Sequence, residues 1–179
     1  MSAEATTRPG ESARAARKFR LVLLIGAAVL AATDLTIKAL AEALLSSGAT
    51  TDLGLINIRL LYNTGIAFSL GANLAPWIII AATGLVIVAL SWYAISTAPT
   101  MTGLSRAGAA LLLGGAVGNF IDRLDGRGVV DYLHTGWFAT FNLADVFVTS
   151  GIALFILGTI LAPRSRNGDE PEAPLSLEA

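Results

Sequence analysis

The chain has 179 residues, of which 54% are hydrophobic and only 14% charged, and its formal net charge is −1. Ordinary soluble domains carry about 25% charged residues, so this composition, with a mean hydropathy of +0.68, indicates an integral membrane protein and excludes a disordered chain. The near balance of 12 Lys and Arg against 13 Asp and Glu argues against a nucleic-acid binder. The absence of cysteine excludes disulfides and thiolate chemistry, and the single histidine, His134, excludes a zinc site built from several histidines.

Four apolar segments are long enough to cross a hydrocarbon core of about 30 Å, which takes about 20 residues of helix. They run from about Leu21 to Leu45, from Leu74 to Ile95, from Leu104 to Ile121 and from Leu143 to Ala162. The first follows a basic flank, as the apolar run of a signal peptide does. Because Asp34 and Lys38 lie within a run that stays apolar to Leu45, we interpret it as a retained span.

An even number of spans places both termini on one side of the membrane. Eight Lys and Arg residues lie in the terminal segments and the second connection, against three in the two opposite loops, so the positive-inside bias predicts cytoplasmic termini. Residues 1–18 and 163–179 are polar and rich in Ala, Pro, Gly and Glu. We therefore predict a disordered N-terminal arm over 1–18, a four-span domain over 19–162 and a disordered tail over 163–179.

The two loops predicted on the outer side, 46–73 and 122–142, carry apolar and aromatic residues. The β-branched residues and partial alternation of Leu55–Tyr62 predict short strands at the interface. Trp137 and Tyr132 suit the membrane–water boundary, and we interpret His134 as an interfacial loop residue.

The unusual polar residues collect at one depth, near the outer surface, because of the direction in which each span runs. They are Asp34, Lys38, Asn63, Asn119, Asp122, Arg123, Asp131, Asn142 and Asp145. Charges within spans are costly and usually face the bundle interior in pairs. The sequence therefore predicts one polar cluster.

Several members of this cluster have two interpretations. Asp34 and Lys38 are four residues apart, so they share a helix face and can form an ion pair. Such a pair either links spans or serves a catalytic site. Asp122 and Arg123 also have two interpretations. They either form a structural charge pair that closes the helix end or serve a catalytic site. Asn63 either makes a turn or hydrogen-bonds the backbone of a substrate.

Asp131 and Asp145 are acids without an obvious basic partner nearby in the sequence. Two carboxyls held close together share a proton, as in the dyad with which aspartic proteases activate water; the alternative is a pair of structural acids. No G-x-S-x-G, H-E-x-x-H or phosphate-binding glycine motif occurs. The glycine-rich run Gly114–Gly118 lies within the third span and predicts close helix packing.

Five blocks, in order, resemble lipoprotein signal peptidase, also called signal peptidase II. They are Asp34–Lys38, Asn63–Phe68, Gly114–Arg123, Val129–Tyr132 and Phe141–Asp145. The resemblance covers about Leu21 to Ala162. It departs from the family at Tyr132, where phenylalanine is common, and it carries nothing onto His134 to Thr140.

The resemblance implies an all-α membrane protein with four transmembrane helices and a small extracytoplasmic β-cradle, in the bacterial inner membrane. It implies an aspartic endopeptidase that removes the signal peptide from diacylglyceryl-modified prolipoproteins, cleaving before the lipidated cysteine. The family's catalytic aspartates fall on Asp131 and Asp145. Its supporting or substrate- and globomycin-contacting residues fall on Asp34, Lys38, Asn63, Gly65, Asn119, Arg123 and Asn142, to which we add Asp122 on its helical spacing.

We expect no metal or organic cofactor. The expected partners are the lipid-modified prolipoprotein, membrane lipid and globomycin-type inhibitors, and the expected state is a monomer without nucleic acid. Two other classes of protein compete. A transporter or proton channel also uses intramembrane acids, but commonly has internal repeats, and we find none here. A scaffold would not explain two unpaired acids beside three asparagines.

Overall fold

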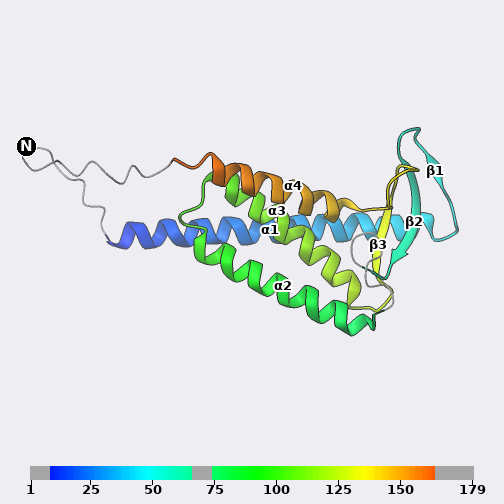
Figure 1. Ribbon diagram of the computed structural model, residues 1–179, viewed down its shortest axis with the longest axis horizontal. Helices are drawn as coiled ribbons and strands as arrows, with labels where there is room; N and C mark the ends of the chain where they lie inside the picture. Colours follow the sequence, from blue (N-terminus) through cyan, green and yellow to red (C-terminus); the bar gives the residue numbers. More distant parts are fainter. Residues whose placement is uncertain (1–8, 66–73, 164–179) are drawn as a thin grey trace, which may run out of the picture.

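The computed structural model describes residues 9–65 and 74–163. Its elements are α1 (Pro9–Leu45), β1 (Thr51–Asp52), β2 (Asn57–Asn63), α2 (Pro76–Thr97), α3 (Gly103–Arg123), β3 (Val129–His134) and α4 (Leu143–Ile160). The four helices run along the long axis of the molecule, and the small sheet lies across one end of them (Figure 1). All four helices are long and apolar enough to cross a membrane, so the predicted fold of four spans with a small sheet is confirmed.

The start of α1 differs from the sequence prediction. The helix begins at Pro9 and has 37 residues, so residues 9–18 are helical, and the prediction of a disordered arm is wrong for this part of it. The physical reason is composition. This stretch is rich in alanine and arginine, which favour helix in water as well as in a membrane. At 1.5 Å per residue the helix is about 55 Å long, which exceeds the hydrocarbon core. Residues 1–8 and 164–179 lie outside the described residues.

The central helix of the bundle is α3, which packs most extensively against α4 and α1 and also carries the contact with α2. Its glycines allow this close approach. A Cβ atom on Gly114 would meet Ala27 of α1, and one on Gly115 would meet the carbonyl oxygen of Ala144 in α4. The sequence prediction of close helix packing through the glycine-rich run is confirmed.

The sheet is antiparallel with the order β1-β2-β3. Residues Val129 to Tyr132 of β3 are buried, and Leu61 of β2 lies opposite Asp131. Tyr132 packs with Ala41 and Leu45 in a hydrophobic cluster that joins the sheet to the end of α1. This packing holds β3, and with it Asp131, across the ends of the helices.

Candidate active site

The two aspartates Asp131 and Asp145, which we call the dyad, come from different elements at the sheet end of the bundle. Asp131 lies on β3 and is 1% exposed. Asp145 lies in the first turn of α4, where its Oδ2 accepts the backbone N–H of Asn142 at 3.1 Å and its own N–H donates to Asn142 Oδ1 at 3.0 Å. A helix N-terminus favours a negatively charged side chain, and this reciprocal capping box holds the Asp145 carboxyl at that position.

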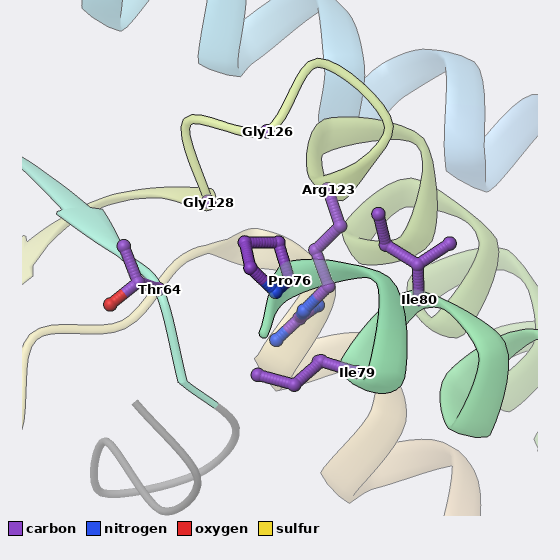
Figure 2. Close-up of a pocket in the computed structure, with 7 residues that line it drawn as sticks. All are labelled: Thr64, Pro76, Ile79, Ile80, Arg123, Gly126 and Gly128. Atoms are coloured by element: carbon purple, nitrogen blue, oxygen red, sulfur yellow. The ribbon is translucent and has the colours of Figure 1, made fainter. Parts of the chain in front are cut away.

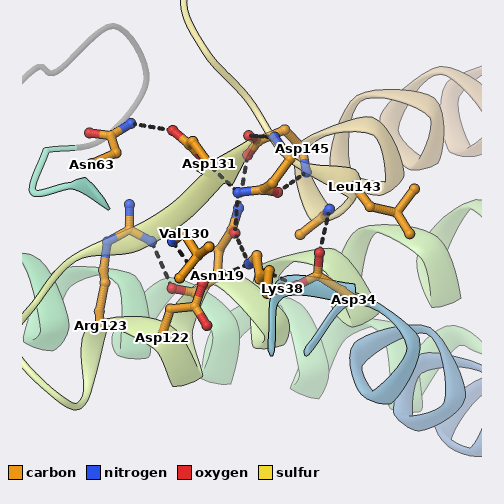
Figure 3. A network of polar contacts seen from close by, with 12 residues as sticks. Asp34, Lys38, Asn63, Asn119, Asp122, Arg123, Val130, Asp131, Leu143 and Asp145 are labelled. Atoms are coloured by element: carbon orange, nitrogen blue, oxygen red, sulfur yellow. Dashed lines mark hydrogen bonds and ion pairs between the residues drawn. The ribbon is translucent and has the colours of Figure 1, made fainter. Parts of the chain in front are cut away.

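Asn142 connects the dyad. Besides capping α4 at Asp145, it donates from Nδ2 to Asp131 Oδ1 at 2.7 Å, and Asn63 donates to the other oxygen of Asp131 at 3.2 Å (Figure 3). Burial, followed by the repulsion of the nearby Asp145 carboxylate, raises the pKa of Asp131 to about 6. The Asp145 carboxylate is therefore close enough to affect the pKa of Asp131.

The third asparagine of the cluster also reaches the dyad. Asn119 of α3 donates from Nδ2 to Asp145 Oδ1 at 2.8 Å. Its Oδ1 accepts from Lys38 Nζ at 2.7 Å and from Asn142 Nδ2 at 3.1 Å. Every asparagine of the predicted cluster thus contacts a dyad carboxyl.

The buried Lys38 of α1 links the dyad to the helices. Its Nζ lies 2.8 Å from Asp34 Oδ2 and 2.8 Å from Asp122 Oδ2, so the ion pair predicted from the spacing of Asp34 and Lys38 is confirmed. Asp34 accepts the backbone N–H of Ala144 at 2.8 Å, and Asp122 accepts that of Val130 at 3.1 Å. Ala144 and Val130 immediately precede the two dyad aspartates. The two carboxylates that pair with Lys38 therefore each fix the backbone next to a dyad residue.

Arg123 does not pair with Asp122, and the structural alternative for these two residues is wrong. Consecutive helix residues do not face each other: Asp122 turns toward Lys38, whereas Arg123 donates to the carbonyl oxygens of Asn119 and Gly65, each at 2.8 Å.

The segment after β2 is held by its own turn as well as by Arg123. Asn63 Oδ1 accepts the N–H of Gly65 at 3.0 Å, so Asn63 makes a turn and holds Asp131 with the same amide. Residues 66–68 of this block lie outside the described residues.

A small cavity lies beside Arg123, at the start of α2 (Figure 2). It is lined by Thr64, Pro76, Ile79, Ile80, Arg123, Gly126 and Gly128. Its volume of about 30 Å³ suits water rather than a peptide. Within the described ranges, no three His, Cys, Asp or Glu side chains are grouped as metal ligands are.

Two polar contacts that secure the sheet were not predicted. Arg127 Nη1 lies 2.8 Å from Glu42 Oε1, which also accepts the Tyr62 hydroxyl at 2.6 Å. His134 ends β3, and its Nδ1 lies 3.1 Å from the guanidinium of Arg59. These partners are far apart in sequence and lie on different elements or loops, and the sequence does not indicate which residue each of these charges contacts.

Comparisons with known proteins agree on one family. The model of signal peptidase (SPase) II matches residues 26–161. A lipoprotein signal peptidase of Bartonella tribocorum is 38% identical over 149 residues, covering 79% of this chain and 87% of that protein. One of Rhodococcus jostii is 33% identical over 159 residues, covering 79% and 74%.

Solved structures show the same fold. A bacterial membrane enzyme determined by the in meso method at 2.3 Å matches with a TM-score of 0.67 and 25% identity, covering 78% of this chain and 87% of that one. The match over most of the chain, the relatives and the four apolar helices lead to one conclusion: this is a multi-pass membrane protein that belongs to the signal peptidase II family.

Proposed function

We propose that this chain is an aspartic endopeptidase that removes the signal peptide from diacylglyceryl-modified prolipoproteins and cleaves before the lipidated cysteine. The observation that carries the proposal is the pair Asp131 and Asp145, bound by one asparagine at the end of a membrane-spanning bundle. Family membership implies a peptidase, and within the described residues this pair supplies groups for acid–base activation of water.

In the proposed reaction the dyad holds a water molecule between its carboxyls. Asp145, placed at the N-terminus of α4, is ionised and takes the proton of the water as general base. Asp131, whose raised pKa favours the protonated form, donates a proton to the scissile carbonyl oxygen. The water attacks the carbonyl carbon directly and gives a tetrahedral gem-diol, so no covalent enzyme intermediate forms. The gem-diol collapses as the peptide C–N bond breaks: the proton taken by Asp145 passes to the departing amine, and Asp131 recovers its proton from a gem-diol hydroxyl as the carboxyl product forms.

The membrane supplies the rest of the substrate's environment. The signal helix lies among the spans, and its acyl chains lie in the bilayer, with the scissile peptide at the sheet end of the bundle. Binding energy from the lipid, remote from the reacting bond, selects lipidated over unlipidated substrate. We place this end at the outer surface of the bacterial inner membrane, with both termini in the cytoplasm.

One chain supplies every contact of the network, which fits a monomer. Globomycin-type inhibitors would compete with the substrate for the same site.

The experiment is cleavage of a purified diacylglyceryl-modified prolipoprotein by the detergent-solubilised protein, followed by gel shift with and without globomycin. Wild type is expected to cleave, and globomycin to block cleavage. Asp131→Asn and Asp145→Asn are each expected to lose about 10²- to 10⁴-fold in rate, the usual contribution of a general acid or base.

The matched control is Asp125→Asn, an exposed aspartate paired with Arg127 outside the dyad, which should cleave as wild type does. Thermal unfolding of all variants separates lost chemistry from lost fold. A folded Asp131→Asn or Asp145→Asn that keeps most of the wild-type rate would remove that residue from the proposed mechanism. A wild type that leaves intact a substrate cut by a known signal peptidase II would reject the proposed function.

A further inference from the structure

The buried ammonium group of Lys38 contacts three acceptors, whereas an ion pair with Asp34 needs only one. Its side chain is 2% exposed, and its Nζ lies 2.8 Å from Asp34 Oδ2, 2.8 Å from Asp122 Oδ2 and 2.7 Å from Asn119 Oδ1. An ammonium group has three donors and no acceptor. Two N–H groups donate to the two carboxylates, and the third donates to the amide oxygen of Asn119, whose nitrogen contacts Asp145.

This third bond determines the orientation of the amide. Because Lys38 only donates, Asn119 must turn its oxygen toward Lys38 and its Nδ2 toward Asp145, 2.8 Å away. The same oxygen accepts from Asn142 Nδ2, which also donates to Asp131. The amides are thus aligned from the ammonium toward both dyad carboxyls, each of which receives N–H donors (Figure 3).

We propose that Lys38 is a positioning residue that acts on the dyad through Asn119, by fixing the amide so that Asp145 receives an N–H donor and remains the ionised base. Hydrogen bonds in a chain polarise one another, so the cation bound to the oxygen of Asn119 strengthens the bond from its nitrogen to Asp145. This inference rests on the proposed function, in which Asp145 is the base.

Other groups around the dyad also affect its charge. The charged side chains that face it from the packed elements are Asp34 and Lys38 on α1 and Asp122 and Arg123 on α3, and β2 presents the neutral Asn63. A test of Lys38 must therefore remove its bond to Asn119 without changing the net charge of this group.

The double variant Asp34→Asn/Lys38→Met meets this requirement. Asp34, Lys38 and Asp122 together carry −1 + 1 − 1 = −1, and after the double substitution Asp122 alone carries −1. We expect kcat to fall about 100-fold, as for a misplaced catalytic group. The acidic limb of the pH–rate profile, which reports the dyad as a whole, should move upward, because the dyad loses an N–H donor that favours its charged form. The matched control is Glu42→Gln/Arg127→Met, which removes an ion pair remote from the dyad and should leave the limb in place.

Asn119→Leu tests the same step without changing the net charge. Leucine keeps the branched shape of the side chain, but it neither accepts from Lys38 nor donates to Asp145. The acidic limb should again move to higher pH, although the ion pairs of Lys38 are kept. This variant keeps the inference testable if the double variant does not fold.

The assay follows cleavage of the lipidated prolipoprotein across pH, with thermal unfolding at each substitution. A raised acidic limb in folded variants supports the positioning role. A purely structural Lys38 would lower thermal stability and leave the limbs of both variants where wild type has them, and that result would overturn the inference while the proposed function stands. A wild type that cleaves no lipidated substrate would overturn the proposed function and the inference together.

Discussion

Asp131 and Asp145 carry the same side chain in different surroundings. Asp145 lies at a helix N-terminus, where the backbone favours its charge. Asp131 is buried on a strand, and burial penalises its charged form. In the proposed mechanism, this difference in surroundings assigns separate roles to the two chemically identical groups, with Asp131 as the acid and Asp145 as the base.

Asp131 should therefore titrate well above an ordinary aspartate. Its pKa is raised from the usual 3.8 to about 6, first by burial and then by Asp145, so it keeps its proton from below pH 4 up to about pH 6. Infrared titration of the detergent-solubilised protein should show a protonated carboxyl signal that disappears as pH rises through about 6. The signal should be missing in Asp131→Asn.

The variant Asp145→Asn provides the control for this titration. It removes the neighbouring charge but leaves the burial, so the midpoint should fall and yet stay above 3.8. If the signal is instead absent from Asp145→Asn and retained in Asp131→Asn, the protonated member of the dyad is the other aspartate, and the proposed roles must be exchanged.

At the scale of elements, the close contact of α3 with α4 determines where Asp145 lies. A Cβ on Gly115 would collide with the backbone oxygen of Ala144, the residue before Asp145, and would press on Phe147 and Val148. Gly115→Ala should therefore lower the free energy of unfolding by about 1–3 kcal/mol through overpacking and also lower the cleavage rate. Thermal unfolding and the gel-shift assay measure the two effects.

Gly26→Ala is the matched control within a membrane-spanning helix. A Cβ at Gly26 would meet only the Ala110 side chain, at an ordinary contact distance of 3.5 Å. Its unfolding and its cleavage rate should stay close to wild type. If Gly115→Ala and Gly26→Ala have the same stability and the same cleavage rate, the close packing of α3 against α4 is not needed to position the site.

The elements themselves could be predicted from sequence to within a few residues, because hydropathy and strand patterns are local. The second span was predicted at Leu74–Ile95 and is Pro76–Thr97, and the predicted strand segment contains most of β2. The start of α1 was not predicted, since hydropathy detects the membrane-embedded part of a helix and not its polar extension. The depth of the polar cluster followed from span direction.

At the scale of the whole molecule, contacts between helices could not be derived in the same way. Lys38 meets Asp122 and Asn119, more than 80 residues away in sequence, because α1 and α3 present those faces to each other. The rotation of a helix about its axis is determined by packing with its neighbours, and a single sequence carries little information on it. Arg123 was correctly predicted to lie in the cluster from its depth in the membrane. Its hydrogen-bond partners could be identified only from the three-dimensional arrangement.

The orientation of the whole molecule in the membrane can be predicted from its charge distribution. The N-terminal end of α1 and the C-terminal end of α4 lie together, opposite the sheet (Figure 1), and the basic residues are concentrated toward that end. The positive-inside bias then predicts that the sheet and the dyad lie on the outer side. Because the chain contains no cysteine, single cysteines can report this orientation without background.

Leu55→Cys, in the turn before β2 and 89% exposed, should react with a membrane-impermeant maleimide added to intact spheroplasts. Thr100→Cys, exposed in the turn between α2 and α3, should react only after the membrane is permeabilised. The reverse pattern would place the dyad on the cytoplasmic side, where a substrate whose signal helix has already been inserted would present its scissile bond on the wrong face of the membrane. Labelling of both positions in intact cells would contradict the four-span topology itself.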